Sequence, residues 1–230
     1  MKYFDQAFLD ENMMGPCSAL IMEELTRGLP LKPGMRVLDL GCGRGITSIF
    51  LAKEFGVQVF AYDLWIPASE NLVRFREAGV EDLVIPLHGD ALEMPFADGF
   101  FDAAVSVDSY HYFGNNDTFF TEKVKPLLKK GGIFAVAFPG LHDEVYPNVP
   151  ERMKPYWSTD DLTMWHSISW WELKFAPHLS GFRGWEMDCH EEAWQVWLDC
   201  ENPYAIGDRD MMAADGGEYL NTIGFTGIVE

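Results

Sequence analysis

The sequence has few basic residues, and this shortage limits the partners that it can bind. Its 230 residues include 17 Lys and Arg against 36 Asp and Glu, which gives a formal net charge of −19 at pH 7. A field of that sign repels nucleic-acid phosphates and anionic lipid headgroups. We therefore expect no nucleic-acid partner and no membrane partner.

Cysteines are also scarce, and long apolar runs are absent. The four cysteines show no CxxC spacing, so the sequence indicates neither a disulfide framework nor a zinc site, and we expect no metal. No apolar run approaches the roughly 20 residues of a membrane-spanning helix. The N-terminal residues carry acids and lack the apolar core of a signal peptide. We expect a cytoplasmic protein.

What the sequence does contain is an alternation of short apolar runs with helical segments over its first 140 residues. Hydrophobic residues make up 48% of the chain, enough for a sizeable core at this length. Strands that alternate with helices indicate βαβ units and a parallel sheet covered on both faces. The predicted strands cover residues 35–40, 57–61, 83–87, 101–107 and 133–138, and the predicted helices cover residues 45–55, 67–78 and 117–128. Pro126 must bend or end the last of these helices, and Gly131-Gly132 is a predicted turn.

The last 90 residues differ in character. Four prolines between residues 139 and 155 indicate an irregular excursion, and seven of the eight tryptophans lie beyond residue 150. A helix is predicted over residues 167–179 and a final strand over residues 219–229. We expect two C-terminal strands that flank an inserted helical segment, with no second independent domain.

Glycines cluster where the first predicted strand ends, in the segment DLGCGRG over residues 39–45. Glycines in such a loop let a ligand approach the backbone closely, and the helix that follows begins with unpaired N–H groups. The dinucleotide fingerprint GxGxxG would need a glycine at position 46, where Ile46 stands. The spacing therefore disfavours an NAD-dependent dehydrogenase.

Acidic residues follow the next three predicted strands. Asp63 lies at the end of the second strand, where a carboxylate accepts hydrogen bonds from a ribose diol. Asp90 follows the third strand, in place to contact an adenine, and Asp108 ends the fourth. Because ligands of parallel sheets bind outside the carboxyl ends of the strands, we expect these groups to share one crevice.

Together, these segments resemble the class I S-adenosylmethionine-dependent methyltransferases over roughly residues 30 to 140. The resemblance implies an α/β fold of the Rossmann-like methyltransferase type: a doubly wound, mostly parallel, seven-stranded sheet with a helical insertion near the C-terminus. It implies one domain over residues 1–230. Within it, residues 1–30 would form a lid and helix, 31–140 the cofactor-binding core, 141–218 substrate-side insertions and 219–230 the final strand.

The resemblance also implies the cofactor, S-adenosyl-L-methionine, and the residues that bind it. The glycine loop would pack against its methionine part, the acid after the second strand would bind both ribose hydroxyls, and the acid after the third would bind the adenine amine. Arg44 stands where the family often has Thr or Ser. The implied cofactor-binding residues are Asp39, Gly41, Cys42, Gly43, Gly45, Asp63, Leu64, Asp90, Ala91 and Asp108.

The chemistry of methyl transfer points to further candidates. Transfer is an in-line displacement, so the enzyme positions the acceptor and excludes water, and an acceptor with a proton to lose needs a base. We take His111 and Tyr110 as candidate catalytic residues, because the ordinary pKa of histidine suits a base near neutrality. Met14, Tyr112 and Trp170 are candidate substrate-binding residues. Each of these side chains also has a structural role open to it, in a cap, a core or a wall.

We therefore expect a methyltransferase that acts on a small molecule at a nitrogen, oxygen or sulfur atom. One alternative is a lipid-modifying enzyme like the cyclopropane fatty acid synthases, although His111 stands where that family carries glutamate. Another is an S-adenosylmethionine-binding protein without catalysis. Exposed tryptophans in the C-terminal part would favour a homodimer.

Overall fold

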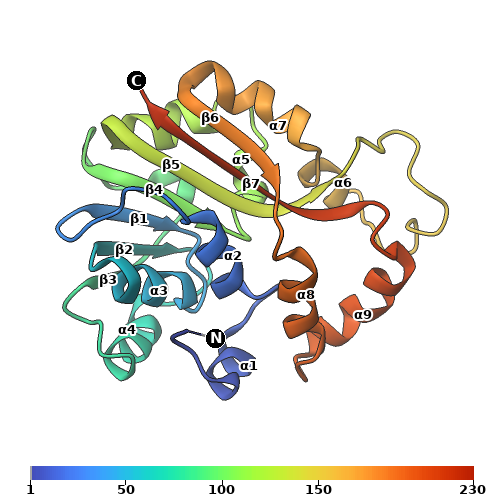
Figure 1. Cartoon of the computed structure of the whole chain (residues 1–230), viewed down its shortest axis with the longest axis horizontal. Helices are drawn as coiled ribbons and strands as arrows, with labels where there is room; N and C mark the ends of the chain where they lie inside the picture. The colour runs from blue at the N-terminus through green and yellow to red at the C-terminus, as the bar shows by residue number, and fades with distance from the viewer. Residues whose placement is uncertain (1) are drawn as a thin grey trace.

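A seven-stranded sheet runs through the computed structural model, which describes residues 2–230 (Figure 1). Its strand order is β3-β2-β1-β4-β5-β7-β6, and β7 is antiparallel to both of its neighbours while the other pairs are parallel. The predicted doubly wound, mostly parallel sheet is confirmed. The strands are β1 (Arg36–Leu40), β2 (Gln58–Asp63), β3 (Val84–His88), β4 (Phe101–Val107), β5 (Leu128–Leu141), β6 (Leu179–Glu186) and β7 (Leu220–Val229).

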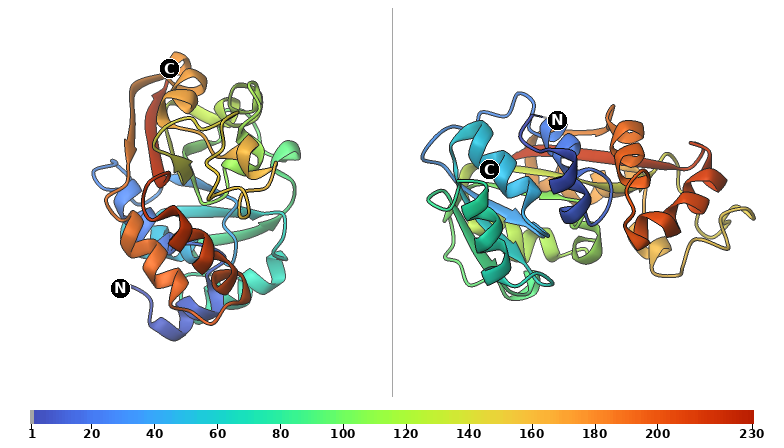
Figure 2. Two further views of the ribbon diagram at one scale, coloured as in Figure 1. Left: turned by 90° about the vertical axis from the view of Figure 1, so that its right-hand side faces the viewer. Right: turned by 90° about the horizontal axis from the view of Figure 1, so that it is seen from below.

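Helices cover both faces of this sheet (Figures 1 and 2). Side chains alternate along a strand, so neighbouring residues of β1 enter different cores: Val37 packs with α2 and α3, whereas Leu38 joins the core that includes α7. The helices are α1 (Gln6–Asn12), α2 (Ser18–Leu25), α3 (Ile46–Phe55), α4 (Ala68–Glu77), α5 (His111–Gly114), α6 (Asp161–Met164), α7 (Ile168–Phe175), α8 (His190–Leu198) and α9 (Pro203–Asp215).

The helical insertion predicted near the C-terminus consists of α8 and α9, which lie between β6 and β7. Glu24 of α2 connects this insertion to the N-terminal part. Its buried carboxylate accepts hydrogen bonds from the Trp185 indole (3.0 Å) and from the backbone N–H groups of Asp188 (3.0 Å) and Cys189 (2.8 Å). These donors hold the pKa of Glu24 below its ordinary value despite its burial, so the connection is made by a charged group.

The helix predicted over residues 117–128 is interrupted at Pro126, as expected. A π-helical turn at Phe120–Val124 is followed by a 3₁₀ turn at Lys125–Leu127, because Pro126 has no N–H for a regular helix. The turn predicted at glycines 131 and 132 falls within the bounds of β5. Gly131 has φ +79°, and residues 129–132 lie between the Phe101–Leu128 and Ala103–Ile133 pairs, so the register against β4 shifts there.

A helix that spans a bilayer needs about 20 predominantly apolar residues. Among residues 2–230, no helix is long and apolar enough to cross a membrane.

Candidate functional site

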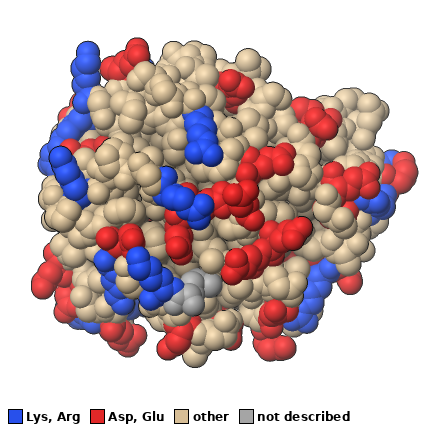
Figure 3. Space-filling view, viewed as in Figure 1, with Lys and Arg blue, Asp and Glu red and all other residues tan. Residues whose placement is uncertain are grey.

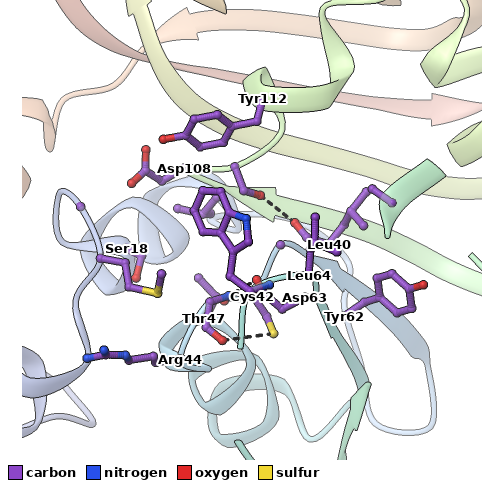
Figure 4. A pocket seen from close by; sticks show the side chains of 18 of the residues that line it. Ser18, Leu40, Cys42, Arg44, Thr47, Tyr62, Asp63, Leu64, Asp108 and Tyr112 are labelled. Atoms are coloured by element: carbon purple, nitrogen blue, oxygen red, sulfur yellow. Dashed lines mark hydrogen bonds between the residues drawn. The ribbon is translucent and has the colours of Figure 1, made fainter. Parts of the chain in front are cut away.

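A cavity of about 260 Å³ opens at the carboxyl ends of β1 to β4 (Figure 4). We call it the strand-end cavity; its wall takes residues from five segments, which lie within residues 12–18, 40–47, 62–65, 89–92 and 107–113 but contribute neither Gly45 nor Tyr110 nor His111. The chain passes from β1 outward to β3 and then returns to β4 on the other side of β1, so the cavity lies at the topological switch point of the sheet. Parallel sheets bind their ligands at that point.

The glycine loop forms one wall of the cavity, and two of its glycines are required by close packing. Gly41 has φ +75°, and a Cβ there would lie 2.0 Å from the Ser109 hydroxyl, which itself donates to the Leu40 carbonyl. Gly45 has φ +83°, and a Cβ there would lie 2.4 Å from the Phe75 ring. The loop is therefore pressed between the end of β4 and α4. Gly41, Cys42 and Gly43 line the cavity, whereas Gly45 does not.

Asp39 lies behind the loop and not in the cavity wall. It is fully buried, and one of its oxygens accepts hydrogen bonds from the Thr47 and Ser48 hydroxyls, both at 2.6 Å. Burial raises the pKa of this carboxyl to about 6. Asp39 therefore fixes the first turn of α3 against β1. Its position behind the loop does not favour the direct cofactor contact that the resemblance implies.

Asp63, at the end of β2, lines the cavity with a carboxylate that backbone groups hold in place. One oxygen accepts from the N–H of Gly43 (2.8 Å), and the other accepts from the N–H groups of Trp65 (2.7 Å) and Ile66 (2.9 Å). These bonds connect the turn after β2 to the glycine loop. Leu64, also predicted, lines the cavity beside it.

Asp90 and Ala91 lie in the cavity wall at the end of β3, as the sequence predicts. The Asp90 carboxylate accepts from the N–H of Leu92 (2.8 Å) and begins a short 3₁₀ turn. The Tyr62 hydroxyl donates to the Asp90 carbonyl (3.2 Å) over Gly89, where a Cβ would lie 2.2 Å from that hydroxyl. A glycine at position 89 thus lets β2 support the turn after β3.

Asp108, at the end of β4, differs from the other two acids. Its backbone is left-handed, with φ +54°, its side chain is half-buried, and no residue between 2 and 230 donates a hydrogen bond to its carboxylate. Gly15 presses on it so closely that a Cβ there would lie 2.1 Å from the carboxylate. Burial, with a contribution from Asp208, raises the pKa of Asp108 to about 8.

The mouth of the cavity is apolar. Five of its residues expose large hydrophobic side chains: Met14, Leu64, Trp65, Leu92 and Tyr112, of which Trp65 is 64% and Tyr112 50% exposed. The rings of Trp65 and Tyr112 pack edge to face with centroids 5.6 Å apart. Sequence reasoning named Met14 and Tyr112 but missed Trp65; its place two residues after the acid that ends β2 was the available signal.

Three further candidates lie outside the cavity wall. Tyr110 is fully buried among aromatic rings of the second core, and His111 is 2% exposed, with a pKa that burial lowers to about 3. Neither lines the cavity, so their placement does not favour the expectation that these two side chains carry the chemistry. Trp170 stacks on His166 with centroids 3.7 Å apart and also lies away from the cavity wall.

Known proteins similar to this chain are methyltransferases. A family model described as a methyltransferase domain matches residues 38–136. The chain is 30% identical over 125 residues to a sterol 24-C-methyltransferase from Gibberella zeae, covering 54% of this chain and 32% of that protein. It is 37% identical over 103 residues to a fatty-acid O-methyltransferase from Mycolicibacterium smegmatis, covering 44% and 36%. The chain thus matches about a third of the length of these curated relatives.

Solved structures share the fold over nearly the whole chain. A geranyl diphosphate C-methyltransferase from Streptomyces coelicolor superposes with a TM-score of 0.74 at 17% identity, covering 93% of this chain and 81% of that one. A phosphoethanolamine N-methyltransferase from Haemonchus contortus superposes with a TM-score of 0.75 at 20% identity, covering 97% and 55%. At these identities the likeness is one of fold, and it includes the segments beyond residue 136.

Proposed function

Because the chain belongs to the class I S-adenosylmethionine-dependent methyltransferases, we propose that it transfers a methyl group to a small-molecule acceptor at nitrogen, oxygen or sulfur. S-adenosyl-L-methionine is the cofactor of that family. One observation carries the proposal: the glycine loop, Asp63 and Asp90 line a single cavity at the switch point of the sheet.

The residues of the cavity fit this cofactor. Gly41 and Gly43 have positive φ angles and no side chains. The amino-acid part of the cofactor could therefore approach their backbone closely. Asp63 is held rigid by three N–H groups and has lone pairs left for a ribose diol. Asp90 and Ala91 stand at the adenine end. When bound, the cofactor supplies an electrophilic methyl group.

The remaining residues position the acceptor and keep water out. Residues 12–18 cover the β4 end of the cavity, and Trp65 and Tyr112 narrow its mouth. An acceptor that is held against these rings loses translational freedom, and much of the acceleration of a displacement comes from such positioning. We propose that residues 1–30 act as a lid and residues 141–218 as the substrate-side part of a single domain.

Three other expectations are retained as proposals: a non-nucleic-acid acceptor, a cytoplasmic location and a homodimer. Three aspartates and one arginine line the cavity among the described residues, which supports the first of them. For a homodimer, sedimentation velocity is the test: a single species at the 26.1 kDa of one chain would reject it.

Methyl transfer is tested with S-adenosyl-L-methionine that carries a labelled methyl group, incubated with the protein and a metabolite extract. We expect extract-dependent formation of S-adenosylhomocysteine and label in a small organic product. The Asp63→Ala variant serves as the control and should lose most of this activity. Binding of S-adenosylhomocysteine without any transfer would favour the non-catalytic alternative. Label in a lipid fraction would favour the lipid-modifying one, for which the comparisons give no specific support.

A further inference from the structure

The carboxylate of Asp108 is the unpartnered acid of the strand-end cavity. Asp63 accepts hydrogen bonds from three backbone N–H groups and Asp90 accepts one, whereas no residue of the described part of the chain donates to the Asp108 carboxylate. Asp108 is half-buried. A partly desolvated carboxylate without donors is stabilised when a donor or a cation arrives. Its left-handed backbone adds strain of a kind that clusters at ligand-binding sites.

The cavity supplies no cation for this carboxylate. Among the lining residues that the structure describes, Arg44 is the one Lys, Arg or His. Its guanidinium donates to the Glu11 carbonyl (2.5 Å), and Figure 4 shows Arg44 pointing toward the N-terminal segment, away from Asp108. The charge of Asp108 is therefore balanced by nothing in the wall.

Further negative charge reaches the same end of the cavity. Burial is the main reason that the pKa values of Asp108 and Tyr112 are raised. Asp208 of α9 adds to both shifts, and Asp161 of α6 adds to that of Tyr112. These two acids have donors of their own, the Trp197 indole for Asp208 (2.8 Å) and the Ser158 N–H for Asp161 (2.7 Å). Figure 3 shows acidic side chains gathered on the surface over α8 as well. The insertions thus bring a negative potential toward Asp108.

The mouth of the cavity is also lined by aromatic side chains. Tyr112 and Trp65 stand at the rim, and Figure 4 shows the Tyr112 hydroxyl turned to the same side of the cavity as the Asp108 carboxylate. Aromatic faces attract cations, and their area binds an apolar body. A ligand that combines a positive charge with an apolar body matches both features.

We infer that the methyl acceptor is an amine with an apolar body, which enters as an ammonium ion and donates its N–H groups to the Asp108 carboxylate. This inference rests on the proposed methyl transfer and names its substrate class. The ammonium passes one proton to the carboxylate, which frees the nitrogen lone pair. That pair forms the new C–N bond as the C–S bond breaks, and the C–S electron pair stays on sulfur. The product is a methylated ammonium ion beside a neutral thioether.

The test measures binding by calorimetry to protein loaded with S-adenosylhomocysteine, so that no turnover occurs. The probes are 2-phenylethylamine, 2-phenylethanol and phenylacetate, which share one apolar body and differ in charge. At pH 8.5 both Asp108 and the amine are mostly in their charged forms. We expect the amine to bind at least tenfold more tightly than the alcohol, and phenylacetate to bind most weakly.

Two variants separate Asp108 from the general field of the protein. In Asp108→Asn the amine should lose about tenfold in affinity while the alcohol changes less than twofold. Asp82→Asn removes the same charge from an exposed turn outside the cavity and should leave all three affinities unchanged. Retained binding of S-adenosylhomocysteine shows that each variant is folded.

The outcomes are distinguishable. An amine that binds no more tightly than the alcohol overturns the inference and leaves methyl transfer standing. So does an Asp108→Asn variant whose affinity for S-adenosylhomocysteine falls as far as its affinity for the amine, since Asp108 would then hold the amino group of the cofactor. Failure of the unmodified protein to bind S-adenosylhomocysteine contradicts the proposed function itself.

Discussion

At the end of β2, the Asp63 carboxylate accepts hydrogen bonds from three backbone N–H groups, whereas at the end of β4 the Asp108 carboxylate accepts none from residues 2–230. The first end is built from backbone and glycines, and its geometry is set before any ligand arrives. The second is built from side chains of the N-terminal segment and the strand-four turn. This difference is consistent with two roles. The β2 end would bind the same cofactor in every catalytic cycle, and the β4 end would gain its missing hydrogen bonds when the acceptor binds.

The largest effect is expected behind the preorganised end, at Asp39. Its pKa rises from the ordinary 3.8 to about 6 on folding, so the native state binds more protons than the unfolded state between these values. Asp39 should therefore contribute a fall in stability on the order of 3 kcal/mol as pH rises from about 4 through 6. Asp39→Asn removes this contribution, while the one from the raised pKa of Asp108 remains in both proteins. Urea unfolding at pH 4 and pH 7 measures it, and parallel behaviour of the two proteins would contradict it.

Asp63→Ala tests the preorganised end directly. We expect the affinity for S-adenosylhomocysteine to fall by about 2 kcal/mol, roughly thirtyfold, because three N–H groups and the ribose diol lose their acceptor. Asp90→Ala is the matched comparison and should cost less, since Asp90 is exposed and accepts one backbone N–H. Calorimetry decides between them, and a larger loss in Asp90→Ala would reverse the assignment of roles.

Gly15→Ala tests the acceptor end. The new methyl group would lie 2.1 Å from the Asp108 carboxylate and must displace it, which should weaken 2-phenylethylamine binding by about 1–2 kcal/mol. Binding of S-adenosylhomocysteine should change less than about twofold, as the two ends are separate. Gly207→Ala, in α9 with open space around it, is the control and should stabilise the fold by about 0.5–1 kcal/mol. If Gly15→Ala lowered the affinity for both ligands equally, the acceptor and the cofactor would not bind at separate ends of the cavity.

The smallest change is expected for Tyr110→Phe, which tests whether the Tyr110 hydroxyl takes part in methyl transfer. The Tyr110 hydroxyl is buried without a hydrogen-bond partner among the described residues, so removing it should raise the free energy of unfolding by about 1 kcal/mol. Transfer of labelled methyl should be unchanged, because the side chain lies outside the cavity. A clear drop in transfer would return Tyr110 to the list of catalytic candidates.

The parts of the molecule that could be predicted are those that short segments determine. The strand at residues 101–107 was placed correctly to the residue, and the glycine loop and the acids after β2 and β3 followed from spacing alone. Each depends on a run of apolar residues that ends in glycine or a polar residue. Such signals are local, so no knowledge of distant contacts was needed.

The parts that were missed depend on tertiary packing. The left-handed turn at Asp108 redirects the chain, and Tyr110 then points into the aromatic core and not into the cavity. Trp65 is aimed at the mouth because Asp63 captures its backbone N–H, a contact that spacing does not reveal. The break in the helix predicted over residues 117–128 shows the same limit, since Pro126 signalled an interruption without fixing its form.

The buried hydrogen bonds of Glu24 have a consequence for shortened versions of the protein. They join α2 to the connection between β6 and α8. Helix α2 directly follows the segment that covers Asp108. A chain trimmed to begin at the first strand would lose this brace together with the cover, and the far C-terminal helices would lose an anchor. Attempts to change which acceptor binds should therefore alter the N-terminal segment and the C-terminal helices together.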